Sequence, residues 1–198
     1  MLPQLVPLRN NEIKRVIAPL IGNEFVPCVS EKKRPEFEIW GWDKKIRTML
    51  RFIKSGDIFC FLFEDRFFCF GRIIAKVTTG HLAEILDCVS DKPCINFNSI
   101  EKAQRLGEPI IWDSYGLFDR KAEGEWRVIG HQEDYKAHDF DEIYLTFGIG
   151  DDWTRRDLYG NTTKITTEEH FRYILVSPKG NYQVIEFVQK HVDDLKKI

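Results

Sequence analysis

Two apolar, aromatic-rich runs on either side of a short polar break constrain this fold more than any other stretch. Ile58–Phe63 and Phe67–Ile74 flank the tripeptide Glu64-Asp65-Arg66, and strand-length runs joined by so short a polar loop predict a β-hairpin. Apolar residues occupy nearly every position, so both faces of this hairpin should be covered, as in a central strand pair. The dipeptide Gly56-Asp57 predicts a sharp turn into the first strand. Gly71 indicates a bulge or a close backbone approach in the second strand.

The rest of the chain alternates between strand-like and helix-like patterns. His81–Val89 follows the hairpin as a third strand, although its apolar spacing would also suit a helix. Ile149–Thr163 mixes aromatic residues with many charges and is predicted to be a loop. Further strands are expected at Pro109–Phe118, Glu125–Gly130 and Glu142–Gly148, and helices at Glu12–Ile17, Lys44–Ile53, Asn98–Leu106, His170–Leu175 and Asn181–Ile198. Together they predict an α+β fold: a strongly bent, barrel-like antiparallel sheet of five to seven strands with flanking helices, one of them C-terminal.

Length and composition favour a single domain over residues 1–198, with residues 1–35 as an N-terminal extension packed on or near it. The chain has 198 residues, 43% of them hydrophobic, which is enough for one sizeable core. No apolar stretch approaches the roughly 18 residues of a membrane span. The N-terminus also lacks the basic-then-apolar pattern of a secretion signal. We therefore expect a cytoplasmic protein that does not enter membranes.

The cysteines are expected to be structural. Five cysteines without CxxC spacing make a poor disulfide or zinc framework. Cys60, Cys69 and Cys88 lie in apolar runs, where a free thiol behaves as a small buried hydrophobic group. Opposed positions on the hairpin could bring Cys60 near Cys69, but we expect free thiols there.

The charges are balanced overall and unevenly distributed along the chain. The formal net charge is −2, so no global field favours nucleic acid or an anionic membrane. Residues 1–54 carry eleven basic and six acidic residues, a net charge of +5. Residues 133–152 carry one basic and seven acidic residues, a net charge of −6. One end is therefore basic, and one later region is strongly acidic.

Catalytic and cofactor motifs are missing from the sequence. It contains no GxGxxG, GxxxxGK[ST], GxSxG or HExxH pattern. Asp151-Asp152 beside Arg155-Arg156 is more typical of a solvated surface charge network than of acid–base chemistry. A metal site could be drawn from four residues, but their loop spacing has low specificity: His131, His138, Asp139 and Asp141. We therefore expect no enzyme, no cofactor and no bound metal.

Trp153 differs from the other tryptophans in its surroundings. It follows Asp151 and Asp152 and precedes two arginines. An aromatic residue in a charged loop fits the anchor role that Trp, Tyr and Arg often have at protein interfaces. A buried tryptophan that pins a long loop is an equally good interpretation, so the sequence leaves both open.

Three short segments resemble a known protein family. They are Ser55-Gly56-Asp57-Ile58-Phe59, Phe70-Gly71-Arg72-Ile73-Ile74 and Glu125-Trp126-Arg127-Val128-Ile129-Gly130. They look like the "GD-hydrophobic-F" strand, the aromatic-Gly-Arg-apolar strand and the "W-apolar-G" strand of the immunity protein 26 family. That family belongs to bacterial polymorphic toxin and contact-dependent growth inhibition systems. The resemblance covers roughly residues 54–131, and the chain differs from the pattern in its long N-terminal segment and in the helix expected near 98–106.

The resemblance implies a non-enzymatic inhibitor that binds the C-terminal domain of a cognate toxin, commonly a nuclease, in the cytoplasm of the producing cell. Independently, an acidic region can complement the basic surface with which a nuclease holds phosphates. The candidate toxin-binding residues all lie in or beside the acidic region: Glu133, Asp134, Asp139, Asp141, Glu142, Asp151, Asp152 and Trp153.

The alternative is a small β-barrel module that binds nucleic acid. It would use the basic residues of the 32–54 region, with Trp40 and Trp42 as stacking platforms for bases. Acidic residues flank the basic cluster closely on both sides, which favours a solvated loop. We therefore expect a protein partner and not a nucleic acid.

Overall fold

The computed structural model describes residues 37–39, 52–119 and 125–198. The predicted helix at Glu12–Ile17 and the extension 1–35 lie outside these ranges. So do Trp40, Trp42 and all but the last two residues of the predicted helix Lys44–Ile53.

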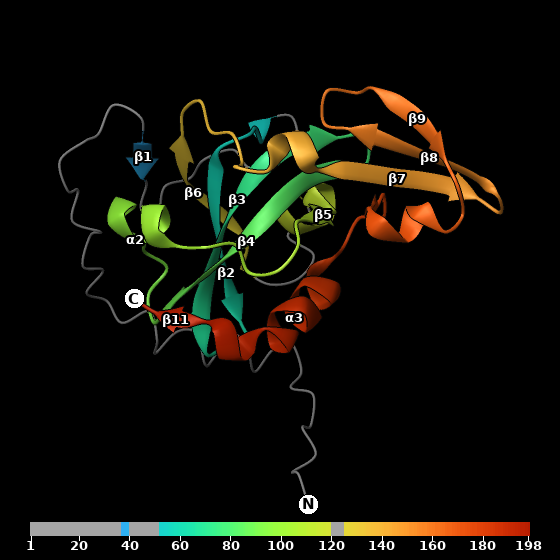
Figure 1. The fold of residues 1–198 in the computed structure, drawn as a ribbon. Coiled ribbons are helices and arrows are strands. Elements are labelled where there is room, and N and C mark those ends of the chain that lie inside the picture. The colour runs from blue at the N-terminus through green and yellow to red at the C-terminus, as the bar shows by residue number, and fades with distance from the viewer. Residues whose placement is uncertain (1–36, 40–51, 120–124) are drawn as a thin grey trace, which may run out of the picture.

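A seven-stranded sheet forms the centre of the described chain (Figure 1). The predicted hairpin is confirmed as β2 (Asp57–Phe63) and β3 (Phe67–Val77), and the predicted third strand as β4 (Gly80–Ser90). The strand order is β1-β6-β2-β3-β4-β11, with β5 also paired to β4. The remaining strands are β1 (Phe37–Ile39), β5 (Ile110–Trp112), β6 (Arg127–Gln132) and β11 (Lys196–Lys197). Only β11 runs parallel to its neighbour within the described sheet.

Both faces of this sheet are covered, as the saturated apolar hairpin predicted. One face holds an aromatic core in which Phe59, Phe61, Trp112 and Trp126 pack with ring centroids 4.0–6.5 Å apart. The other face holds two smaller apolar clusters. One of them lies around Ile58 and the other around Ile74 and Leu82. Because β1 and β11 end the strand order without pairing to each other among the described residues, the sheet is not a closed barrel.

The glycine predictions are also confirmed. Gly56 has a φ of +84°, which favours glycine, at the turn that enters β2. At Gly71 the β3–β4 register shifts, and a Cβ there would lie 2.0 Å from the ring of Phe59. Only glycine therefore lets β3 approach β2 so closely.

Three cysteines are buried, free thiols as expected, whereas Cys94 is disulfide-bonded, which the cysteine spacing did not predict. Cys60, Cys69 and Cys88 are all free and buried. Cys60 is paired in register with Phe70, and Cys69 with Phe61. Since successive residues of a strand point to opposite faces, the two hairpin cysteines lie on opposite sides of the sheet.

A second, four-stranded sheet corrects the predicted loop at Ile149–Thr163. Its order is β10-β7-β8-β9. The strands are β7 (Tyr144–Ile149), β8 (Asp152–Asp157), β9 (Thr162–Ile165) and β10 (Ile174–Leu175). The prediction was wrong because it equated charge with loop. The guanidinium groups of Arg155 and Arg156 lie 4.8 Å and 5.1 Å from the ring centroids of Tyr144 and Phe147, so their side chains cover aromatic surface of the sheet.

The helices are shorter than predicted. The helix expected at Asn98–Leu106 is α2 (Phe97–Lys102), capped by Asn96, whose side chain accepts a hydrogen bond from the Ser99 amide. It ends early because Asp87 and Ile85 of β4 accept hydrogen bonds from the amides of Gln104 and Leu106.

The C-terminal helix also ends before its predicted limit. The helix α3 (Asn181–Lys190) buries Val184 and Val188 against the aromatic core. A 3-10 turn, Val192–Asp194, and β11 follow it. Pairing with β4 therefore replaces the last turns of the predicted helix.

Two further elements differ in kind from the prediction. The strand predicted to reach Phe118 stops at Trp112, and Tyr115–Asp119 form a π-helix. The helix predicted at His170–Leu175 is a 3-10 turn, Glu169–Arg172, followed by β10. The described chain is mostly β structure with few helices. This agrees with the predicted antiparallel sheet and C-terminal helix.

Candidate functional site

A buried network of charged side chains lies on the main sheet, between the two smaller apolar clusters. Its centre is Glu84 on β4, which is 3% exposed and faces Arg72 on β3 in register. Arg72 donates to Glu84 from Nε and Nη2 at 2.9 Å and 2.7 Å. Arg105 donates from Nε at 3.0 Å, and the hydroxyl of Tyr135 donates at 2.6 Å. One carboxylate therefore accepts four hydrogen bonds from three elements of the chain.

The same network holds the connection between β6 and β7. Arg105 donates from both terminal nitrogens to Asp139, at 2.6 Å and 2.8 Å. This bidentate contact lowers the pKa of Asp139. Arg72 also donates to the side chain of Gln132, and its guanidinium lies 3.8 Å from the ring centroid of Tyr135. Residues 132–139 are therefore tied to the sheet at several points.

The Gly56-Asp57 turn supports this connection from the other side. A Cβ on Gly56 would lie 2.1 Å from the carbonyl oxygen of Gln132, and the Gln132 amide donates to the Gly56 carbonyl. His131 donates from Nδ1 to Asp57 at 2.9 Å. Burial raises the pKa of Asp57, and the hydrogen bonds from Lys54 and His131 partly offset this rise. Residues of the family motifs therefore build the frame on which the acidic region rests.

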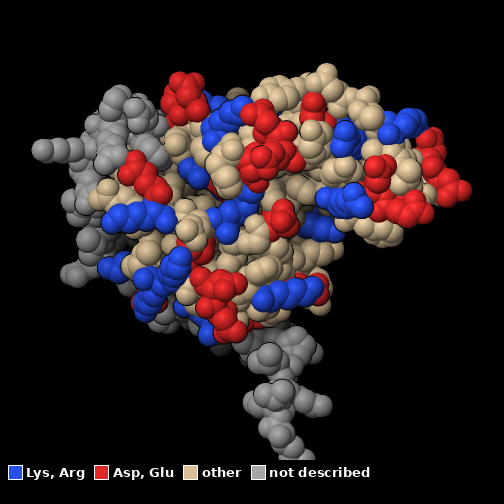
Figure 2. Space-filling model, viewed as in Figure 1, with Lys and Arg blue, Asp and Glu red and all other residues tan. Residues whose placement is uncertain are grey.

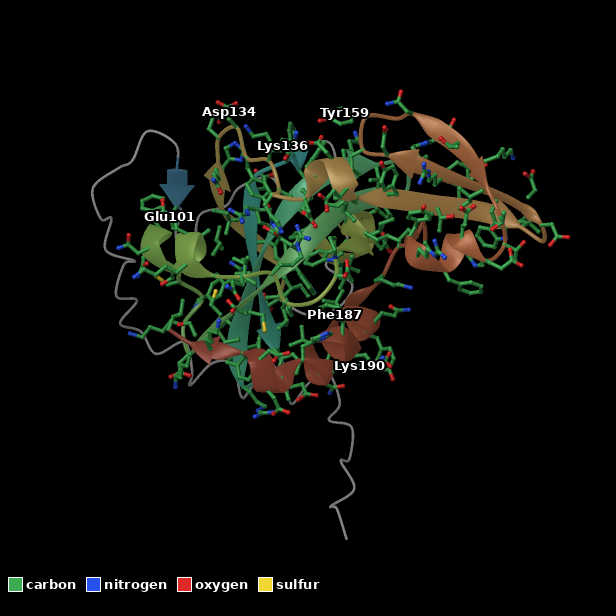
Figure 3. The ribbon with its side chains drawn as sticks, in the orientation of Figure 1. Glu101, Asp134, Lys136, Tyr159, Phe187 and Lys190 are labelled. Carbon is green, nitrogen blue, oxygen red and sulfur yellow. The ribbon has the colours of Figure 1, made fainter. Side chains whose placement is uncertain are left out.

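Five of the predicted acidic residues lie in the connection between β6 and β7. Glu133, Asp134, Asp141 and Glu142 are exposed, whereas Asp139 is half-buried in its contact with Arg105. Asp134 has a φ of +53° and points outward (Figure 3).

Three of these five acidic groups have a basic neighbour. Besides Asp139, Asp141 accepts hydrogen bonds from Tyr159 and Lys136, which lower its pKa. Glu133 lies 3.1 Å from Nε2 of His131. The net charge of −6 along the sequence therefore overstates the free acidic charge of this surface.

The other three candidates lie at the opposite end of the second sheet. Asp151 lies in the turn between β7 and β8 and accepts a hydrogen bond from Thr167 at 3.2 Å, and Asp152, the first residue of β8, pairs with Lys164. The indole of Trp153 donates to the Gly150 carbonyl at 2.7 Å. Figure 2 shows acidic side chains at the end of this sheet, separated by Lys and Arg from those nearer the centre. The fold therefore divides the eight predicted residues into two groups.

Two residues that were not predicted from the sequence contact Trp153. The imidazole of His170 stacks on the indole with ring centroids 3.7 Å apart and planes 9° apart. The ring centroid of Phe171 lies 3.8 Å from that of His170, and Phe171 is 80% exposed. The only signal in the sequence is an aromatic pair set among charges, in a segment whose pattern predicts a helix.

The metal site considered from the sequence, at His131, His138, Asp139 and Asp141, does not form among these described residues. His131, Asp139 and Asp141 point to different partners, and no group of three or more potential ligands among the described residues could hold a metal. Arg155 and Arg156 do not pair with the adjacent aspartates either. Arg155 donates to the hydroxyl of Tyr173. Arg156 lines a groove of about 450 Å³ between the β3–β4 turn and the second sheet, and its Nε has no hydrogen-bond partner there.

A family model matches the part of the chain that contains all eight candidate residues. It also covers the Gly56-Asp57 turn and the Glu84 network that support the β6–β7 connection. The model of immunity protein 26 matches residues 54–155. The chain belongs to the immunity protein 26 family. This match confirms the resemblance and extends it past residue 131 into β8. A search of curated proteins and a search of solved structures found no match. Among the described residues no helix is long and apolar enough to cross a membrane.

Proposed function

We propose that this protein binds the C-terminal domain of a cognate bacterial toxin and neutralises it by covering its active or substrate-binding surface. The observation that carries the proposal is the family match, because residues 54–155 include all eight candidate contact residues. Inhibition of this kind needs a complementary surface and no chemistry of its own. We place the protein in the cytoplasm of the toxin-producing cell.

A nuclease is the toxin class that the charges favour. Nucleases hold phosphates with basic surfaces, and opposite charge speeds the encounter of two proteins. Three of the candidate carboxylates form no ion pair with described residues: Asp134, Glu142 and Asp151. These three are therefore the best charge partners for lysines and arginines of the toxin.

The buried network supports the same role through rigidity. The contacts of Arg72, Arg105 and Tyr135 with Glu84 fix the connection before any partner arrives. Binding then requires less ordering of loops, so more of the contact energy appears as affinity. This gives the family motifs a function that does not require them to touch the toxin.

Charge reversal tests the proposal directly. The probe is a catalytically inactive C-terminal domain of the toxin encoded immediately upstream, and affinity is measured by titration calorimetry at two salt concentrations. The triple variant Asp134→Lys, Glu142→Lys and Asp151→Lys should weaken binding by about 100-fold, because like charges then face each other. The loss of affinity on adding salt should also become smaller.

A control variant with the same change in net charge separates local from global effects. Glu108→Lys, Asp193→Lys and Asp194→Lys alter three exposed residues outside the candidate surface and should change affinity less than threefold. Equal affinity for the two triple variants would contradict the proposed charge partners. The nucleic-acid alternative depends on residues 32–54, most of which lie outside the described ranges. A mobility-shift assay at low salt tests it, since it demands strongly salt-dependent binding of DNA or RNA.

A further inference from the structure

The second sheet carries an aromatic group whose last member is almost fully exposed. We call Trp153, His170 and Phe171 the aromatic stack. Its inner two rings have their polar atoms satisfied locally. The Trp153 indole donates to the carbonyl of Gly150, and His170 donates from Nδ1 to the carbonyl of Thr167. The outermost ring, Phe171, is 80% exposed and so adds little to the core.

The register of the strands places a further apolar side chain on the same face of this sheet. Trp153 is paired with Gly148, and Leu175 with Thr146. Gly148 and Thr146 are two residues apart on β7, so their partners point to one face. Leu175 is 50% exposed. The stack and Leu175 therefore give one face of the sheet exposed apolar groups, a feature that commonly marks interaction sites.

Two acidic residues, Asp151 and Glu168, lie near the aromatic stack, and the exposed Arg172 follows Phe171 in the chain. Asp151 is tied by Thr167 to the turn that carries His170 and Phe171. Glu168, next to this turn, is exposed. A complementary partner would place apolar groups over the rings and cationic groups near Asp151 and Glu168.

We infer that the aromatic stack is the apolar centre of the toxin interface, contacted by a toxin surface with an apolar pocket flanked by lysine or arginine. The inference rests on the proposed function and adds the centre of the contact to it. Interfaces depend mostly on a few central aromatic residues surrounded by polar groups. Aromatic rings held by stacking on a neighbouring ring also lose little conformational entropy on binding. The arm formed by this sheet extends from the main sheet, as Figure 1 shows, so a partner can reach it.

A single substitution, with a control at the tip of the β7–β8 hairpin, tests the inference. Phe171→Ala should weaken binding of the inactive upstream toxin domain by about 30-fold or more in the same calorimetric titration. Phe171→Tyr keeps the ring and should remain within threefold of wild type. Ile149→Ala changes a side chain that is 89% exposed at the tip of the hairpin. By register Ile149 points to the opposite face from Trp153, so this variant should also bind within threefold of wild type.

The outcomes separate the inference from the proposed function. If the wild-type protein binds the toxin domain and Phe171→Ala binds it within threefold of wild type, the inference is overturned. The toxin-binding role would still stand. An equal loss in Ile149→Ala would overturn the inference as well, since the effect would not be confined to one face. If wild-type protein fails to bind the toxin domain, the proposed function itself is refuted. Phe171 is so exposed that its variants should keep the wild-type melting temperature, which a thermal scan checks.

Discussion

Replacing the central carboxylate of the buried network by an amide should destabilise the whole domain. Glu84 accepts four hydrogen bonds, three of them from guanidinium groups. Glutamine has one acceptor oxygen, and its NH2 group would face N–H donors. In Glu84→Gln at least one guanidinium therefore loses its acceptor inside the protein.

The size of the effect depends on the burial of the two arginines. The side chains of Arg72 and Arg105 are 13% and 10% exposed, so water cannot fully replace the carboxylate. Removing one partner of a buried ion pair costs about 3–5 kcal/mol. Arg105 keeps Asp139, and Arg72 keeps Gln132 and the Tyr135 ring. We therefore expect the lower end, about 3 kcal/mol, or a fall in melting temperature of roughly 6–12 °C.

Urea denaturation measures this loss, and a surface variant calibrates it. Glu186→Gln removes the same charge from an exposed pair with Lys190 on α3, which should cost at most about 0.5 kcal/mol. A loss below about 1 kcal/mol for Glu84→Gln would refute the reasoning, because it would mean that the network is not energetically coupled to the fold.

Three further predictions concern packing, pH and thiol reactivity. Gly71→Ala should destabilise the protein by about 2 kcal/mol or more in the same denaturation assay, because its Cβ would overlap the ring of Phe59. Burial lowers the pKa of His81 to about 4, against 6.5 for an unperturbed histidine. The unfolded chain then binds the proton first, so stability should fall by about 3 kcal/mol as pH drops from about 6.5 to 4. Burial raises the pKa of Cys88 to about 12, so its thiol should react with a thiol reagent only after unfolding.

Each of these predictions has its own control. Gly150→Ala meets no atom within 4 Å and faces only the strain of a φ of +60°, so it should cost about 1 kcal/mol. A cost as large as that of Gly71→Ala would show that overlap is not the cause. The stability difference between wild type and His81→Gln isolates the contribution of His81. A difference that stays constant between pH 4 and 7 would contradict the assigned pKa. Native-state labelling of Cys88, found by mass spectrometry, would show that the thiol is accessible.

The hairpin could be predicted from local sequence because it satisfies several local rules at once. Its runs are saturated with apolar residues, their lengths suit strands, and a polar tripeptide joins them. The short motifs at Gly56-Asp57 and Gly71-Arg72 pointed to the correct family for a related reason. Each glycine meets a steric demand made by a nearby strand, so the motif is tied to the fold.

Of the second sheet, β7 was predicted as the strand at Glu142–Gly148, but β8 and β9 could not be predicted because they are stabilised by contacts across the chain. In β8 the side chains of Arg155 and Arg156 cover rings on a neighbouring strand, which a charge count along the sequence cannot reveal. The ends of the helices failed in the same way. Hydrogen bonds to β4 decide where α2 stops, and pairing with β4 makes the chain extended after α3 and its 3-10 turn.

For the candidate site, the sequence by itself determined which residues carry acidic charge and that they cluster between positions 133 and 152. Only the tertiary structure decided which of those charges are free. It paired Asp139 with Arg105, thirty-four residues away, and left Asp134 without an ion pair among the described residues. It also brought His170 and Phe171 onto Trp153. Charge is a property of a residue, whereas its neutralisation and exposure depend on partners that only folding brings within reach.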